Sequence, residues 1–88
     1  MSTAFENSQA TVTTSVTEIA EIAVGEQRLE VRNQGPSTVY LGSGSVTVAT
    51  GFPLHPGERY TTSVPAAFDA VLYGITESGT ADVRAIAP

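Results

Sequence analysis

The sequence predicts a small all-β protein, an antiparallel β-sandwich or barrel of about seven or eight short strands. Three observations lead to this prediction. Thr, Val and other residues that favour extended backbone dominate most of the chain. Gly and Pro interrupt them at intervals of roughly 8–12 residues, and no stretch has a sustained helical period. At 88 residues, the chain is long enough for one domain and no more.

The N-terminal part combines a polar segment with two expected strands. Residues 1–9 are polar and lack periodicity, so we expect a flexible N-terminal arm ahead of a single β-sandwich domain over residues 10–88. Residues 10–16 are rich in Thr and Val and predict a strand. Residues 17–24 are ambiguous, because Ile19 and Ile22 lie three apart, as they would on a helical turn. The stretch is short for a helix and a glycine follows it, so we favour a strand.

The clearest strand pattern lies in residues 27–33, where two apolar residues alternate with Arg28, Glu30 and Arg32. Residues 33–36 have the composition of a turn. Further strands are expected at residues 38–41, 46–49, 59–64, 70–76 and 81–87.

Two turns among these later strands are specific. Pro56 and Gly57 suit the central positions of a type II turn, because Pro fixes φ and Gly accepts a positive φ. Residues 77–80 are expected to join the last two strands as a hairpin. Alternation along the strands predicts an inward-facing set, which is Leu29, Val31, Val39, Leu41, Val46, Val48, Leu54, Val71, Tyr73, Ile75, Val83 and Ala85.

The charge balance argues against several classes of partner. The chain has nine acidic residues against four basic ones, a net charge of −5, and all four basic residues are Arg. Nucleic-acid and anionic-membrane binding need clustered cations, so we expect neither partner. The N-terminal residues lack the basic and apolar regions of a signal peptide, and no apolar run approaches a membrane span. Without Cys, no disulfide stabilises the fold.

The sequence offers little for catalysis, so we expect a protein that is not an enzyme. His55 is the only His; it lies in the turn around Pro56, has no recognisable acid partner, and is expected to be solvated. No His, Cys, Asp or Glu cluster has metal-ligand spacing, so we expect no metal and no cofactor. The stretch Gly42 to Ser45 resembles a phosphate-binding loop only loosely, because no Lys follows, and a hairpin turn is favoured.

Five residues are candidates for partner binding: Phe5, Arg28, Arg32, Tyr40 and Tyr60. Tyr40 should point away from its apolar neighbours, and Tyr60 is expected to be similarly exposed. Two outward tyrosines fit a sugar platform or a subunit contact, and we favour the contact because Tyr is enriched at interfaces. Arg28 and Arg32 fit either solvated cross-strand pairs or ion pairs between subunits.

Three longer motifs occur in the second half of the chain. They are N-x-G-x-x-T-V-Y-L-G-x-G-x-V (Asn33 to Val46), G-F-P-L-x-P-G-E (Gly51 to Glu58) and L-Y-G-I-T-x-S-G-T-A-x-V-R (Leu72 to Arg84). Together they resemble small β-sandwich proteins and domains of tailed bacteriophages, namely capsid decoration proteins and the β-rich domains of head and tail fibres. The resemblance implies a structural role in the virion and carries over no catalytic residue. Residues 1–24 lie outside it.

The function that the resemblance implies is a capsid decoration protein. It would be made in the host cytoplasm, bind the major capsid protein lattice on the outer surface of the virion, and associate with itself as a homotrimer. The alternative is a tail-fibre or head-fibre domain that binds glycan or cell wall through Tyr40 or Tyr60. A third possibility is an intracellular β-module with another protein partner, which only the lack of a signal sequence supports.

Overall fold

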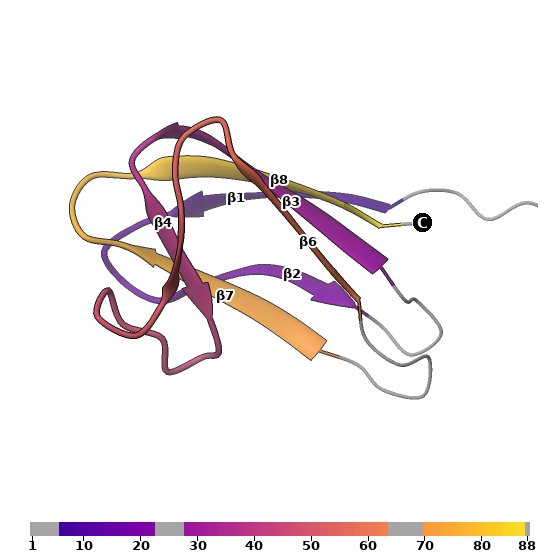
Figure 1. Cartoon of the computed structure of the whole chain (residues 1–88), viewed down its shortest axis with the longest axis horizontal. Helices are drawn as coiled ribbons and strands as arrows, with labels where there is room; N and C mark the ends of the chain where they lie inside the picture. Colours follow the sequence, from indigo (N-terminus) through magenta and orange to yellow (C-terminus); the bar gives the residue numbers. More distant parts are fainter. Residues whose placement is uncertain (1–5, 23–27, 64–69, 88) are drawn as a thin grey trace, which may run out of the picture.

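The fold is a small antiparallel β-sandwich, as the sequence predicts (Figure 1). A computed structural model describes residues 6–22, 28–63 and 70–87, except for the side chains of Glu6 and Ile22. The strands are β1 (Glu6–Val12), β2 (Thr17–Ile22), β3 (Arg28–Pro36), β4 (Val39–Gly42), β5 (Phe52–Leu54), β6 (Arg59–Ser63), β7 (Ala70–Thr76) and β8 (Ala81–Ala87). Within the described residues there is no helix long and apolar enough to cross a membrane.

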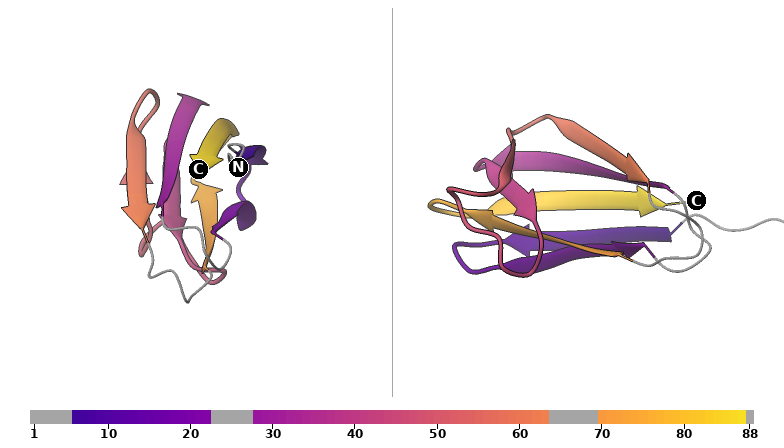
Figure 2. Two further views of the ribbon diagram at one scale, coloured as in Figure 1. Left: turned by 90° about the vertical axis from the view of Figure 1, so that its right-hand side faces the viewer. Right: turned by 60° about the horizontal axis from the view of Figure 1, so that its bottom comes forward.

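The strands form two four-stranded sheets, and every pairing is antiparallel. The first sheet has the order β1-β8-β3-β6, and the second has the order β2-β7-β4-β5. Figure 2 shows β1, β2, β3 and β8 running along the long axis of the molecule, whereas the short strand β4 crosses that direction steeply. Only β4 and β5 are consecutive strands within one sheet; every other connection between described strands changes sheet. The expected hairpin at residues 77–80 is therefore wrong, because β7 pairs with β2 and β4 while β8 pairs with β1 and β3.

The core lies between the two sheets and is filled by small and β-branched side chains. Its buried hydrophobic residues are Val12, Ile19, Ala20, Leu29, Val31, Val39, Leu41, Val46, Leu54, Ala81, Val83, Ala85 and Ala87. Strands β3 and β8 alternate strictly between buried and more exposed positions, as a strand with one face on a core should. The expected inward set is confirmed on these two strands and on β4, and for Val46 and Leu54.

The inward face of β7 differs from the prediction. Val71, Tyr73 and Ile75 were expected inside, but they are only half-buried, while Gly74 and Thr76 are buried and Leu72 packs against the core. Both faces of this strand carry apolar residues, so alternation alone does not identify the inner one. The inward position 74 suits glycine because a Cβ there would lie 2.8 Å from atoms of both Ile19 and Val39.

The ambiguous stretch after residue 16 is a strand, as favoured. The pairing of β2 with β7 shifts register between Glu18 and Ala20, which is a β-bulge. Ile19 and Ala20 are both buried as a result, although they are adjacent in sequence. The bulge therefore explains why the apolar spacing here departs from strict alternation.

The arm expected over residues 1–9 is wrong from Glu6 onward, because β1 begins there and pairs with β8 from Glu6 opposite Ala87 to Val12 opposite Ala81. A polar edge strand keeps its outward side chains in solvent, and Gln9 also donates a 3.0 Å hydrogen bond to the Asp82 carboxylate. Polarity therefore did not distinguish an edge strand from an arm. Residues 1–5 lie outside the described part of the chain.

Two further boundaries differ from expectation. Strand β3 continues through the expected turn at residues 33–36, with a register irregularity between Asn33 and Pro36. The expected strand at residues 46–49 is instead a pair of turns, and Val48 is only half-buried. The side chains of Thr47 and Thr50 hydrogen-bond each other and nearby backbone N–H groups, which favours turns over strand pairing. The type II turn is supported by Gly57 at φ +87° and by the 3.0 Å bond from the Glu58 N–H to the His55 carbonyl.

Candidate functional site

The outer face of the first sheet carries all four basic side chains of the protein. Buried residues of β3 point into the core, so Arg28 and Arg32 on the alternate positions point outward. Cross-strand partners share a face, and Arg32 lies opposite Arg84 of β8 on one side and Arg59 of β6 on the other. We call this surface the arginine face.

Three of the arginines form a continuous row across neighbouring strands. Gln9 of β1 pairs with Arg84, Arg84 with Arg32, and Arg32 with Arg59. Arg28 lies on the same face but outside the row, opposite Ser63. We call Arg84, Arg32 and Arg59 the arginine row. Strand β3 positions it, because β3 is the central strand that pairs with both β8 and β6.

The row is largely without counter-charge. Within the described residues, Arg84 and Asp82 form the only ion pair, with the Arg84 Nη2 and Nε atoms 2.9 and 3.0 Å from the two carboxylate oxygens. The hydrogen bond from Arg84, and then the one from Gln9, hold the pKa of Asp82 below its ordinary value of 3.8. The same contact with Asp82 raises the pKa of Arg84. Glu30 also lies on this face, but in the next row, opposite Ile86 and Thr61.

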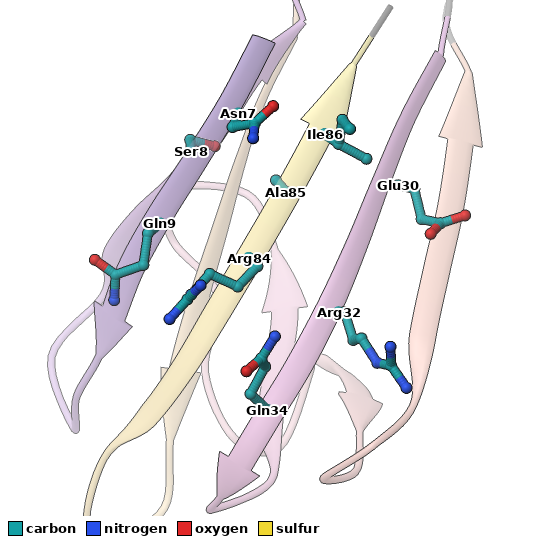
Figure 3. Close-up of a pocket in the computed structure, with 9 residues that line it drawn as sticks. All are labelled: Asn7, Ser8, Gln9, Glu30, Arg32, Gln34, Arg84, Ala85 and Ile86. Atoms are coloured by element: carbon teal, nitrogen blue, oxygen red, sulfur yellow. The ribbon is translucent and has the colours of Figure 1, made fainter. Parts of the chain in front are cut away.

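A shallow groove runs over the arginine face (Figure 3). It has a volume of about 410 Å³ and is lined by Asn7, Ser8, Gln9, Glu30, Arg32, Gln34, Arg84, Ala85 and Ile86. In Figure 3 the Arg84 side chain extends toward β1, whereas the Arg32 side chain extends toward β6. The two guanidinium groups therefore lie toward opposite sides of the groove, with Gln34 reaching from β3 into the space between them.

The two candidate tyrosines lie in different places. Tyr40 points out of the second sheet, as expected from its buried neighbours Val39 and Leu41, and its cross-strand partners are Pro53 and Ile75. The expectation that Tyr60 points outward is wrong: it lies opposite inward-facing Val31 and packs against the core.

The ring of Tyr60 instead contacts Phe52, with centroids 5.6 Å apart. Phe52 is 59% exposed. A sugar platform made of Tyr40 and Tyr60 therefore does not form. Phe5 lies outside the described residues.

The candidate set included Arg28 and Arg32 but missed Arg59 and Arg84. The alternation of the strands indicates that all four face outward. Their assembly into one row depends on β3 lying between β6 and β8, and strand order cannot be read from the alternation of one chain.

The remaining polar groups do not form a recognisable reaction centre in the described part of the chain. His55 is exposed in its turn, with its Nδ1 atom 3.2 Å from the Thr38 hydroxyl. Among these residues, no three His, Cys, Asp or Glu side chains lie close enough together to hold a metal ion. A second hollow of about 260 Å³ lies by β1 and β2, and Glu18 and Glu21 are the ionisable residues among the described ones that line it.

Comparison with models of known protein families, with curated proteins and with solved structures found no match to this chain. The features of the molecule that bear on function are therefore its sequence motifs and its two outer sheet surfaces.

Proposed function

We propose that the protein is a structural component of a bacteriophage virion, a non-enzymatic capsid decoration protein that binds the outer surface of the major capsid protein lattice. The observation that carries this proposal is the set of three motifs between Asn33 and Arg84, which resemble those of phage decoration and fibre proteins. A homotrimer seated on the shell is the assembly that this resemblance implies.

The contacts among the motif residues support the view that the motifs mark a structural module. The Asn33 amide of the first motif donates to the Leu54 carbonyl of the second at 2.8 Å. The Ser37 hydroxyl of the first donates to the Ser78 carbonyl of the third at 3.0 Å. The three motifs therefore meet at one end of the sandwich, where they hold its connections together rather than lining a cleft. Motif residues that hold connections together support a fold, and function then depends on the surfaces.

The surfaces of the molecule also support a role in binding. An arginine face with little internal counter-charge lies on one sheet. The other sheet has the half-buried apolar side chains of Tyr40, Tyr73 and Ile75 on its outer face. Such surfaces suit contacts with other proteins, because exposed Arg and Tyr are enriched at interfaces.

The test is binding to phage shells that lack the protein. Purified protein is added to such shells at increasing concentration, pelleted with them, and located by cryo-electron microscopy. We expect saturable occupancy at symmetry-related positions on the outer surface, and a higher temperature of shell disruption once these positions are filled. Absence of the protein from the shell at every concentration, with or without its presence on tails, would contradict the proposal. Binding to tails alone would favour a fibre domain.

A further inference from the structure

We propose that the arginine row docks onto a carboxylate-rich patch of a partner protein. The inference rests on the proposed function for the identity of that partner, which would be the capsid shell. Its chemical content, recognition of clustered carboxylates by Arg84, Arg32 and Arg59, comes from the geometry of the sheet.

Repulsion among the arginines of the row destabilises the folded sheet. Directly opposed side chains on neighbouring strands have Cβ atoms about 4.5–5.5 Å apart, and like charges at such positions destabilise a sheet. Here Arg32 has an arginine on both sides. The chain has an excess of acidic residues, yet none occupies a position in the row. Since the counter-charge is not supplied by the described residues, apart from Asp82 on Arg84, we infer that a partner supplies it.

The spacing and hydrogen-bonding geometry of the arginine row also suit carboxylate groups. Neighbouring strands lie about 4.8 Å apart, so the three arginine positions span about 10 Å. The Arg84 and Arg32 side chains diverge over the groove, as Figure 3 shows. Each planar guanidinium can bind one carboxylate with two parallel hydrogen bonds. Carboxylates spaced along a strand or loop of a partner protein fit this spacing.

The distribution of charge favours a protein over a nucleic acid as the partner of the arginine row. Among the side chains that the structure describes, the arginine face carries four positive and two negative groups, the latter Glu30 and Asp82, for a net charge of +2, whereas the whole chain has −5. A long polyanion would meet repulsion beyond the face, since exposed charges act over a Debye length of about 8 Å at physiological salt. A patch of a few carboxylates on a partner protein would contact only the arginine row and would avoid this repulsion. Among the described side chains that line the groove, none is an aromatic ring on which a base would stack.

The experiment compares single-charge variants for binding to shells. Arg32→Gln and Arg59→Gln each remove one charge from the row. Arg28→Gln is the matched control, because it removes the same charge from β3, the strand of Arg32, at a position outside the row. We expect each row variant to weaken binding roughly tenfold, as for an interfacial arginine, and the control to change it less than about threefold. The loss should shrink as salt is raised, since salt screens the attraction.

Two further variants separate recognition from a structural role. Asp82→Asn releases Arg84 from its internal partner, so we expect binding to become about threefold tighter. Arg32→Gln removes like-charge repulsion, so its urea midpoint at low salt should equal or exceed that of the wild type. A merely structural row would give the opposite result, with a lower midpoint and an unchanged affinity per folded molecule. That result, or row variants that bind shells as tightly as Arg28→Gln, overturns the inference and leaves the proposed function standing.

A probe independent of the shell distinguishes the two proposals. If the wild type fails to bind shells, the proposed function fails, and the row is tested with a ten-residue polyglutamate peptide by following the arginine Nε–H signals in NMR spectra. Selective shifts of Arg32, Arg59 and Arg84 that saturate support the inference, and equal shifts of all four arginines contradict it. A DNA oligonucleotide of equal charge that binds more tightly than the peptide also contradicts it. Self-association through the row, detected by sedimentation and lost in Arg32→Gln, would do the same.

Discussion

At the scale of the residue, Asn33 combines a fully buried polar side chain with three hydrogen bonds to backbone groups. Its side chain is fully buried, and its amide donates to the carbonyls of Ser37 and Leu54, both at 2.8 Å, while its oxygen accepts from the Gly35 N–H at 2.7 Å. Asn33→Ala would remove one hydrogen-bond partner from each of these three backbone groups. We expect a loss of about 3 kcal/mol in the free energy of unfolding, measured by urea denaturation.

The control for Asn33 is its neighbour on the same strand. Gln34 is exposed, and Gln34→Ala should change the free energy of unfolding by less than about 0.5 kcal/mol. If the two variants are equally stable, the amide of Asn33 does not hold the connections together as described.

The lowered pKa of Asp82 makes the stability of the fold depend on pH in the acid range. Its hydrogen bonds to Arg84 and Gln9 lower its pKa from the ordinary value of 3.8. A carboxyl with a lower pKa in the folded state stabilises the fold above 3.8, and this contribution is lost as the pH falls through the folded-state pKa. From about pH 5 to about pH 2, the urea midpoint of Asp82→Asn should therefore fall less than that of the wild type. Equal slopes for the two proteins would contradict this assignment.

At the scale of the element, β7 depends on a glycine. A Cβ at Gly74 would lie 2.8 Å from Ile19 Cδ1 and 2.8 Å from Val39 Cγ1, so both side chains would have to move. We expect Gly74→Ala to destabilise the domain by about 1–3 kcal/mol in urea denaturation, because the core between β2, β7 and β4 would be overpacked.

A double-mutant cycle tests the cause of this loss. Ile19→Val removes the clashing Cδ1 atom, so it should cost less in the Gly74→Ala background than in the wild type. Gly44→Ala is a matched control, since a Cβ there would meet the Tyr73 ring at an ordinary 3.5 Å. Additive effects of Gly74→Ala and Ile19→Val would mean that the crowding at Ile19 is not the cause.

The elements also show where the sequence was sufficient. In residues 28–32 of β3 and 81–85 of β8, small or apolar residues alternate with charged ones, so the buried faces of both strands and the extent of β8 were predictable, whereas the continuation of β3 through residues 33–36 was not. Strand β7 has apolar residues on both faces, and its inner face is marked by the fit of Gly74 between Ile19 and Val39 of the neighbouring strands β2 and β4. Strand β1 is polar because it is an edge, and its pairing with β8 is a long-range contact that local composition does not encode.

For the whole molecule, the fold class followed from composition and turn spacing, but the candidate site did not. The outward direction of each arginine follows from local alternation. The arginine row requires in addition that β8, β3 and β6 be neighbours, and these strands are far apart in the chain. The expected exposure of Tyr60 is wrong for a related reason. Tyr60 lies on the inner face of β6, because β6 pairs with β3 so that Tyr60 is opposite the buried Val31.

The arginine row is a conformational epitope. Residues 84, 32 and 59 come together only in the native sheet, and in an unfolded chain the same charges are dispersed. A partner that reads the row therefore selects folded molecules, and its binding adds to their stability by mass action, by about 2.7 kcal/mol when its concentration is 100 times the Kd. For a domain this small, that gain is a substantial fraction of the whole. The partner would thus bind natively folded copies in preference to unfolded ones, and would stabilise each copy that it binds.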